Sequence, residues 1–484
     1  MTLLSLLVGF LLPTLTGWTV LQSLEGTHPV LFPLERTALG CILGLVLSMF
    51  LVFVVHVTTG APLTLMTFLI VQASGLLMLG ILFLQRHVAG STHPVAAHAE
   101  DYMPEWLKHI CGILLLWITI KTMVAGVTFL LLTPSYFDDS ITNWNLRGKV
   151  FFYDHALTLV MPAESPITSP RGISSYPPSV PMMKTWLALV AGRWDEPLIN
   201  SIHIVWYVCA LILVFFAVRR YASHAWGLFA VYLLGSIPLY LMHGTNAYAD
   251  AFLSVHIFAS ISMLLHAARA HHAQARMSYF RIAALCIAVL PFTKNEGMIV
   301  YLPPLLLILC LILWQLKRSQ QLTGRDVMQV LLWHIVGLVL IAGPWLAFKW
   351  MHGLSFGNGK PFTSLAIGWQ ENVLLSIFIN TFFEGNWLFL LPLLFGLLFW
   401  QWRTAFSRLL PLTLFFLILY CGQALLYLFT GLSTEALRQT GYARGLVQIT
   451  PVMVLLCTLL LERGIGRHLP LWARLKAGLG SDSD

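Results

Sequence analysis

The chain has 484 residues, of which 58% are hydrophobic and only 10% are charged, and its mean hydropathy is +0.79. Soluble domains carry about 25% charged residues, so this composition excludes a water-soluble globular fold. The formal net charge of +8 arises from basic residues scattered through short loops rather than gathered in one stripe, which argues against nucleic acid as a partner.

Apolar runs of about 20 residues, the length that crosses about 30 Å of hydrocarbon, recur along the chain. We therefore expect an all-α polytopic membrane protein with about 13 transmembrane helices. The predicted spans lie near residues 1–21, 36–58, 62–85, 107–133, 199–218, 223–242, 248–267, 280–292, 297–315, 327–350, 386–402, 409–430 and 446–461.

Three parts are expected along the chain: an N-terminal three-span extension (1–105), a transmembrane catalytic module (106–465) and a cytoplasmic tail (466–484). The first run lacks a basic segment before it, so we interpret it as a retained span rather than a removable signal peptide. The module contains two long outside loops, and the first of them is predicted to form two amphipathic helices lying on the membrane. The loops are 134–198 and 351–385, and the helices 139–153 and 179–194.

The distribution of charge predicts which face is outside. If the N-terminus faces outside, most Lys and Arg residues fall in inside loops and few in the short outside loops, as the positive-inside rule requires. Most acidic residues then fall outside. We therefore expect a multi-pass protein of the plasma (inner) membrane whose site faces outwards, on the exoplasmic (periplasmic) side.

Acidic and basic residues gather in short motifs at the predicted outside ends of spans. Asp138 and Asp139 follow the fourth span, and Trp144, Arg147 and Lys149 come soon after them. Further motifs follow in chain order: Ser175-Tyr176-Pro177-Pro178 with Trp186 and Gly192-Arg193-Trp194-Asp195, Asn246-Ala247-Tyr248-Ala249-Asp250, Thr293-Lys294-Asn295-Glu296-Gly297, and Arg444 with Gln448 and Pro451.

These residue types suit the transfer of a sugar from a lipid phosphate. A positioned carboxylate can take the proton of an acceptor hydroxyl, and we expect Asp139 to be this base, with Asp138 as second choice. Asp250 is expected to assist the acceptor or to orient a basic residue. Arg and Lys suit the charge of a leaving phosphate, and the candidates for donor-phosphate binding are Lys294, Arg444, Arg147 and Lys149.

Supporting roles are expected for further residues near these motifs: Glu296, Asn246, Tyr176, Trp144 and His243. Each assignment has a structural alternative. Asp138 and Asp139 could cap a helix, Lys294 could form a surface ion pair, and Arg444 could snorkel to the interface. The aromatic residues could be interfacial anchors.

The order of the motifs over residues 110–460 resembles that of bacterial GT-C superfamily glycosyltransferases, in particular the protein O-mannosyltransferase and aminoarabinose transferase group. The resemblance implies a GT-C-like fold and a polyprenyl-phosphate-linked sugar as donor. In the simplest family pattern the acidic loop follows the first helix, so the extension 1–105 has no counterpart there.

No cofactor is expected besides the lipid-linked donor. The seven cysteines fall inside apolar runs without ligand spacing, so no metal site is predicted, although a divalent metal is not excluded. Among the histidines, His266, His271 and His272 are predicted to lie solvated on an inside loop.

The leading hypothesis is an inverting membrane glycosyltransferase that acts on an exoplasmic glycan, lipid or protein acceptor. A transporter of lipid or solute would share the hydropathy, but its polar residues would normally lie at mid-bilayer in broken helices. A noncatalytic envelope-assembly subunit and an O-antigen ligase or polymerase are further alternatives. The sequence leaves the sugar, the acceptor and the oligomeric state open.

Overall fold

The computed structural model describes residues 2–87, 105–135, 138–160, 173–355 and 367–466, so the predicted tail 466–484 lies almost wholly outside it. The described part is helical apart from one isolated bridge between Ile367 and Thr430. Ten of its helices are long and apolar enough to cross a membrane, or up to twelve if each of two bent pairs is one span. The all-α polytopic fold is confirmed, and the predicted number of 13 helices is approximate.

The N-terminal extension is a stack of three helices that pack closely on each other: α1 (Thr2–Glu25), α2 (Pro33–Thr59) and α3 (Leu65–His87). Where α1 crosses α2, glycines let the two backbones approach. A Cβ at Gly17 would lie 1.9 Å from the Gly40 carbonyl oxygen, and one at Gly44 would lie 1.9 Å from that of Pro13. Close crossing at small residues is a common way to join helices in lipid.

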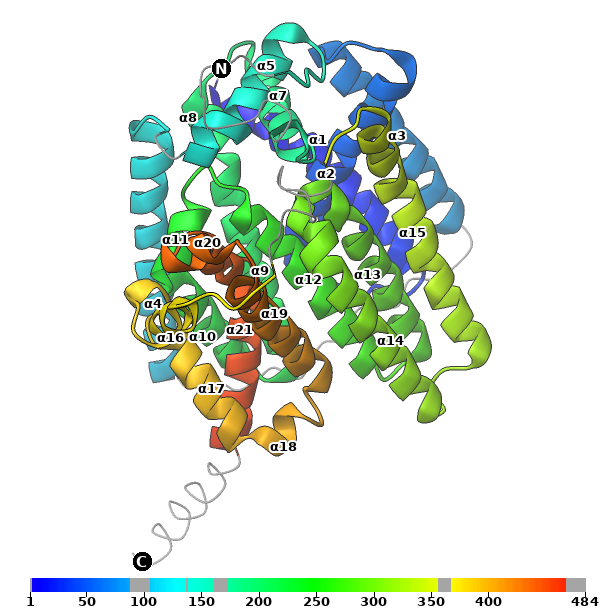
Figure 1. Ribbon diagram of the computed structural model, residues 1–484. Coiled ribbons are helices and arrows are strands. Elements are labelled where there is room, and N and C mark those ends of the chain that lie inside the picture. Colours follow the sequence, from blue (N-terminus) through cyan, green and yellow to red (C-terminus); the bar gives the residue numbers. More distant parts are fainter. Residues whose placement is uncertain (1, 88–104, 136–137, 161–172, 356–366, 467–484) are drawn as a thin grey trace, which may run out of the picture.

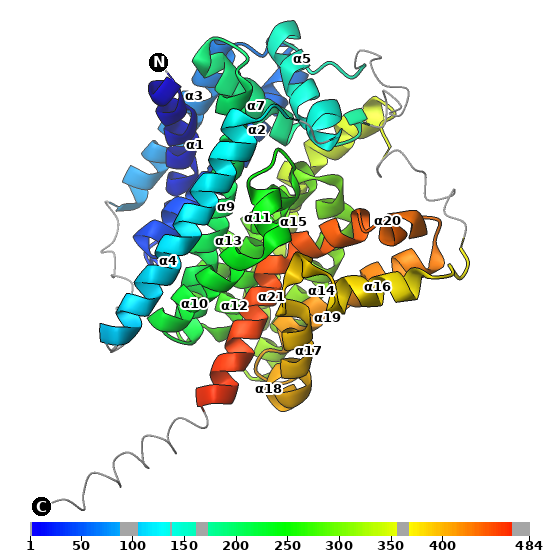
Figure 2. The ribbon, with the colours of Figure 1, turned by 90° about the vertical axis from the view of Figure 1, so that its left-hand side faces the viewer.

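The next segment builds one end of the molecule, which Figures 1 and 2 show at the top. Here a long span leads into short helices that lie across the bundle. We call the end of the molecule with these short helices the upper end. The elements are α4 (Glu105–Gly126), its π-helical continuation η1 (Val127–Leu132), the π-helix η2 (Ser140–Asn145), α5 (Leu146–Asp154), α7 (Ser179–Ala191) and α8 (Glu196–Asn200).

Helix α7 is buried inside the protein, so the prediction of an amphipathic surface helix at 179–194 is wrong. The extension covers it: Trp186 is fully buried, donates its indole N–H to the Gly9 carbonyl at 2.8 Å and stacks on Phe68 of α3. The other predicted surface helix, 139–153, is split into η2 and α5 and turns Trp144 into the protein. The apolar faces of both segments pack against protein rather than lipid.

The centre of the bundle follows, and α12 is its core, with 94% of its most apolar stretch buried. The predicted span 223–242 is bent by 79° where Pro238 starts a new helix. The elements are α9 (Ile202–Tyr221), α10 (His224–Ser236), α11 (Pro238–Gly244), α12 (Asp250–Arg269), α13 (Ala273–Thr293), the π-helix η3 (Gly297–Tyr301), α14 (Leu302–Arg318) and α15 (Gly324–Met351).

The last part contains a second bent pair, with an angle of 115° between 373–387 and 390–400, so the predicted span 386–402 is only one arm of it. The long final helix then returns through the bundle beside α12 and α9. The elements are α16 (Val373–Phe382), the 3-10 helix η5 (Gly385–Trp387), α17 (Leu390–Trp400), α18 (Trp402–Ala405), α19 (Leu410–Phe429), α20 (Ser433–Leu437) and α21 (Gly441–Gly466).

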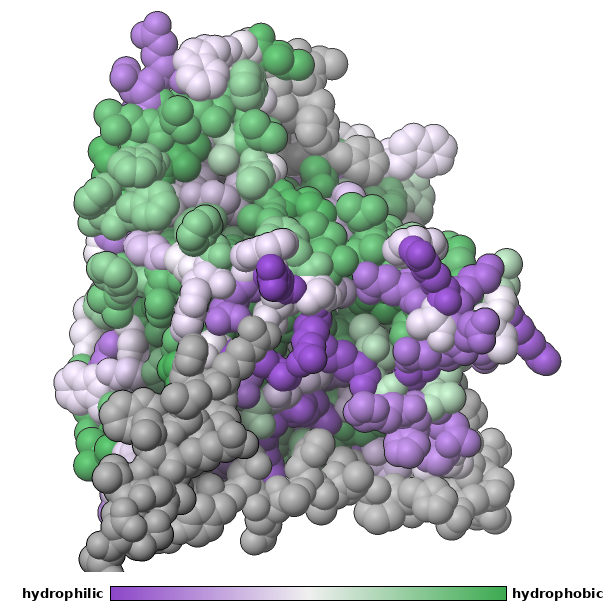
Figure 3. Space-filling view, turned by 90° about the horizontal axis from the view of Figure 1, so that it is seen from below, coloured by the Kyte–Doolittle hydropathy of each residue, from purple (hydrophilic) through white to green (hydrophobic). Residues whose placement is uncertain are grey.

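The end opposite α5 and α7 is the lower end, and Figure 3 shows hydrophilic residues gathered across the middle of this face. A buried ion pair between Glu25 and Arg36, at 2.7 Å, joins α1 to α2 there. The prediction that His266 is solvated is wrong, because His266 is buried and its Nδ1 is hydrogen-bonded to the Tyr221 hydroxyl. Its neighbours His271 and His272 are exposed.

Candidate active site

Charged residues from four separate stretches of the chain meet at helix ends. Arg444, in the first turn of α21, places Nη2 2.6 Å from Asp139 Oδ2 and Nε 3.1 Å from Asp250 Oδ2. Lys294, directly after α13, places Nζ 2.8 Å from Asp250 Oδ1 and 3.1 Å from Glu296 Oε1. We call these five residues the acid–cation cluster.

Asp250 is the centre of this cluster and is fully buried at the first position of α12. Besides Lys294 and Arg444, the amide of Gln448 donates to Asp250 Oδ1 at 2.6 Å, and His243 Nδ1 lies 3.5 Å from Oδ2. A buried carboxylate is tolerated only when cations and hydrogen bonds surround it. Asp250 is therefore held as a fixed anion that positions the basic residues.

Lys294 is enclosed between two carboxylates and is only 1% exposed. Burial by itself lowers the pKa of the Lys294 ammonium, but the charges of Asp250 and Glu296 outweigh burial and raise that pKa above its ordinary value. Lys294 is consequently charged at neutral pH, and its charge is already balanced within the cluster.

Asp139 and Arg444 form the accessible edge of the cluster, with side chains 34% and 30% exposed. The Arg444 guanidinium lies over the ring of Tyr248, 5.1 Å from its centre. The His243 ring also stacks on Tyr248, with the two ring centres 5.1 Å apart. Asp138 is exposed and forms no ion pair within the described residues. Of the two adjacent acids, the structure brings Asp139 to the cluster.

Two further cations lie buried beside the segment Ser175-Tyr176-Pro177-Pro178, which we call the Tyr-Pro loop. Arg147 of α5 is 2% exposed and donates to the Tyr176 carbonyl at 3.0 Å. Lys349, near the end of α15, is fully buried and donates to the Ser175 carbonyl at 2.6 Å and to Asn295 Oδ1 at 3.1 Å. Within the described residues, Nε and Nη1 of Arg147 have no hydrogen-bond partner, and no carboxylate pairs with this side chain.

Tyr176 connects the two groups of charges. Its backbone carbonyl accepts from Arg147, and Trp144 packs edge-on against its ring with the centres 5.5 Å apart. Burial raises the pKa of the Tyr176 hydroxyl well above its ordinary value, and the nearby carboxylates of Glu296 and Asp139 raise it further. The Tyr176 hydroxyl is therefore neutral at physiological pH.

Besides Asp138, two predicted site residues take no part in these contacts. Lys149 is exposed on α5 and makes no ion pair within the described part of the chain. Asn246 is buried, and its Oδ1 accepts from the backbone N–H of Ala247 at 3.0 Å, which shapes the turn before α12. Neither residue touches the acid–cation cluster.

Lys349 was not among the predicted site residues. It is the one Lys or Arg in the predicted span 327–350, close to the end that reaches the Tyr-Pro loop. A charged residue within a predicted span often marks a partner or a polar cavity, so Lys349 within an apolar run was a usable signal. No group of three or more possible metal ligands occurs within the described residues.

No family model and no curated protein sequence matches this chain. Among solved structures it is similar to ArnT from Cupriavidus metallidurans bound to undecaprenyl phosphate, with a TM-score of 0.51 and 15% identity over 76% of this chain. The same protein in the apo state gives a TM-score of 0.49 and 14% identity. The chain has the fold of ArnT.

This similarity is one of fold, and it agrees with the expected all-α polytopic architecture. The chain spans 64% of the length of ArnT, so part of the larger protein has no counterpart here. The ArnT-like fold and the ten or more long apolar helices of the described residues support a multi-pass membrane protein.

Proposed function

We propose that this protein is an integral membrane glycosyltransferase that moves a sugar from a polyprenyl-phosphate carrier to a hydroxyl acceptor. The observation that carries this proposal is the ion pair between Asp139 and Arg444 at the accessible edge of a buried charge cluster. A potential base and a potential phosphate ligand lie side by side there. The ArnT-like fold supports the proposal, because the similar ArnT structure contains undecaprenyl phosphate.

The reaction is a single inverting displacement. The acceptor oxygen forms a bond to the anomeric carbon while the bond from that carbon to the phosphate oxygen breaks. Asp139 takes the acceptor proton, and the bonding electrons leave with the lipid phosphate. The phosphate is already a good leaving group, so cations that hold its charge suffice.

The donor phosphate fits Arg444 and Arg147 better than Lys294. Lys294 is buried and balanced by Asp250 and Glu296, whereas Arg147 has two buried N–H groups with no acceptor within the described residues. A phosphate supplies strong acceptors for such a guanidinium. When Arg444 turns from Asp139 to the phosphate, Asp139 is released to accept a proton, so we propose that the donor binds first.

The placement of the cluster at helix ends favours an enzyme over the transporter alternative. Asp250 begins α12, Lys294 follows α13, and Arg444 lies in the first turn of α21. A transporter that binds its substrate at mid-bilayer would have these groups at the bends of broken helices. We further propose that this upper end faces the exoplasmic side of the plasma (inner) membrane.

Incubation with radiolabelled polyprenyl-phosphate sugars and a membrane extract tests the function. We expect a labelled product with the wild-type protein, and a loss of at least about 100-fold in rate for Asp139→Asn, since general-base catalysis contributes 10²–10⁴-fold. Asp138→Asn is the matched control and should retain transfer. Undiminished transfer by a folded Asp139→Asn variant would remove the assigned base, and substrate flux across proteoliposomes without covalent change would favour a transporter.

A further inference from the structure

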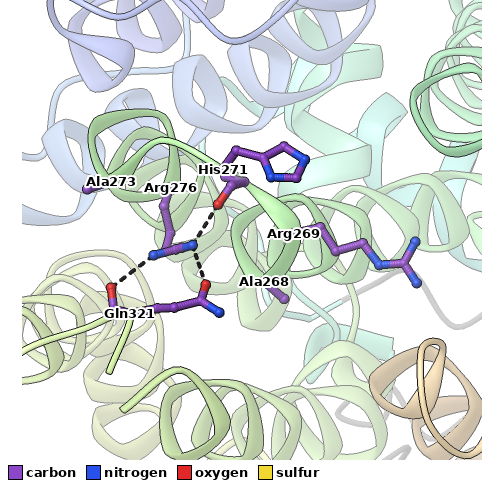
Figure 4. A pocket seen from close by; sticks show the side chains of 7 residues that line it. Ala268, Arg269, His271, Ala273, Arg276 and Gln321 are labelled. Carbon is purple, nitrogen blue, oxygen red and sulfur yellow. Dashed lines mark hydrogen bonds between the residues drawn. The ribbon is translucent and has the colours of Figure 1, made fainter. Parts of the chain in front are cut away.

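A pocket of about 570 Å³ opens at the lower end, far from the acid–cation cluster. It lies where α12 ends, α13 begins and the turn between α14 and α15 passes, and its lining includes Arg269, His271, Ala273, Arg276 and Gln321 (Figure 4). Its volume is in the range of small-molecule sites. Among the residues that the structure describes, its lining contains two arginines and a histidine but no acidic residue.

Arg276 is the buried cation of this pocket and is only 5% exposed. Its guanidinium donates to the Gln321 carbonyl at 2.9 Å, to Gln321 Oε1 at 2.6 Å and to the Ala270 carbonyl at 2.6 Å. Every one of these acceptors is neutral. Its Nε is buried with no hydrogen-bond partner within the described residues, so the charge of Arg276 is positioned but not balanced.

The surroundings do not supply the missing negative charge. Arg269 donates to the carbonyl of Arg408 and lies over the ring of Tyr221, 4.6 Å from its centre. The acids at the lower end that the structure describes are engaged elsewhere: Glu25 with Arg36, Glu35 with Arg220, Asp326 with Thr323, and Glu462 with Arg463. The pocket is therefore a site of positive potential.

The start of α13 adds backbone donors. Ala273 is the first residue of this 21-residue helix and lines the pocket, and His272 before it makes no side-chain cap. The first N–H groups of a helix have no acceptor inside the helix, and its dipole favours an anion there. The buried guanidinium of Arg276 and the N-terminus of α13 thus both line this pocket.

The position of the pocket in the bundle indicates a lipid. It lies at the end of α12 opposite Asp250, about 30 Å away for a 20-residue helix, where the headgroups of one leaflet would be. Exposed apolar side chains begin close to Gln321 on both neighbouring helices, with Trp314 on α14 and Met328 on α15. Acyl chains could pack against these residues while a phosphate enters the pocket.

We propose that this pocket binds the phosphate headgroup of an anionic phospholipid of the bilayer. The inference does not depend on the glycosyltransferase assignment. Basic pockets between helices at this level of a membrane are suited to such headgroups, and each charge near the surface changes the binding by about fivefold.

The test titrates the detergent-purified full chain with phosphatidylglycerol and counts bound lipids by native mass spectrometry. Ala273→Glu puts a carboxylate at the mouth of the pocket, at a helix start where an acid is favourable for folding. We expect about fivefold weaker phosphatidylglycerol binding than in the matched Ala273→Gln variant. Equal binding by the two variants would overturn the proposal.

Two further arms define the ligand and the residue. Phosphatidylcholine should bind more weakly than phosphatidylglycerol, and inorganic phosphate at the same concentration should not displace the lipid; the opposite results would contradict an anionic lipid. Arg276→Gln should weaken binding, whereas Arg325→Gln, which removes an exposed charge at the same end outside the pocket, should not. If Arg276→Gln fails to fold, the two Ala273 variants decide the question.

Discussion

The two carboxylates that contact Arg444 differ in burial and in the number of their hydrogen-bond donors. Asp250 is fully buried and receives donors from Lys294, Arg444 and Gln448, so its charge is fixed in place. Asp139 is about one-third exposed, and among the described residues Arg444 is its one ion-pair partner. A group that accepts a proton during catalysis needs access to the acceptor, and Asp139 is accessible whereas Asp250 is not.

This difference predicts unequal losses of stability when the two carboxylates are replaced. Asp250→Asn leaves Lys294 and Arg444 buried with less counter-charge, and breaking a buried pair in this way costs about 3–5 kcal/mol. Asp139→Asn breaks a partly exposed pair worth about 0–1 kcal/mol. We expect a clear fall in melting temperature for the first variant and little change for the second, and equal shifts would contradict the assigned roles.

The buried Lys184 should make the stability of the folded protein depend on pH. It is fully buried on α7 and donates to the side-chain oxygens of Asn145 and Asn200. Burial lowers the pKa of Lys184 to about 7, with Glu196 opposing the shift. The unfolded chain, with an ordinary pKa of 10.5, therefore binds more protons between these values, and stability rises as pH increases through this window.

The measurement is the melting temperature of the wild type and of Lys184→Met from about pH 7 to about pH 10. Lys184 contributes at most about 1.4 kcal/mol of stability per pH unit, so the slope should be smaller in Lys184→Met. Comparing slopes removes the contribution of other titrating groups. Identical slopes would show that Lys184 does not titrate in this range.

At the scale of helices, the contact between α1 and α2 depends on the absence of side chains. The Cβ of an alanine at Gly44 would meet the Pro13 carbonyl oxygen at 1.9 Å, and backbone atoms cannot yield as a side-chain tip can. Overpacking of this kind costs about 1–3 kcal/mol. Gly44→Ala should therefore lower the melting temperature.

Gly112→Ala is the matched control for this helix contact. Gly112 lies within α4, and a Cβ there would meet no atom within 4 Å. Alanine is favoured over glycine inside a helix by about 1 kcal/mol, so this variant should be neutral or stabilising. If Gly112→Ala lost as much stability as Gly44→Ala, the close approach of α1 and α2 would not be the cause of the Gly44→Ala effect.

For the molecule as a whole, the N-terminal extension packs on the segment that supports the candidate site. The helices α1 and α3 cover α7, and α7 in turn supports the segment that carries Asp139, through the contact of Lys184 with Asn145. The extension thus contributes to the architecture around the candidate site. The extension packs against the rest of the bundle and does not form a separate unit.

The orientation can be tested with single cysteines at the two ends. Lys149 and Arg325 are both exposed, one at each end of the molecule. A membrane-impermeant maleimide should label Lys149→Cys in intact cells and Arg325→Cys only after the cells are permeabilised. The reverse pattern would place the candidate active site inside and would contradict the expected topology.

The sequence by itself determined the class of fold and the ends of the helices that carry charge. Hydropathy is a property of each local run, and the cost of charge in hydrocarbon keeps Asp250, Lys294 and Arg444 near span ends whatever the packing is. For this reason the motifs at these residues were visible without coordinates. The candidate base and its possible partners were predicted residue by residue, although their roles stay predictions.

Tertiary structure decided which of these residues meet and which are covered. Three features of the site depend on contacts between distant parts of the chain. Asp139 rather than Asp138 reaches Arg444, and two carboxylates enclose Lys294. Lys349 donates a hydrogen bond to the Tyr-Pro loop. The burial of α7 depends equally on α1 and α3. Local hydropathy cannot distinguish an apolar face covered by lipid from one covered by protein, because both remove it from water.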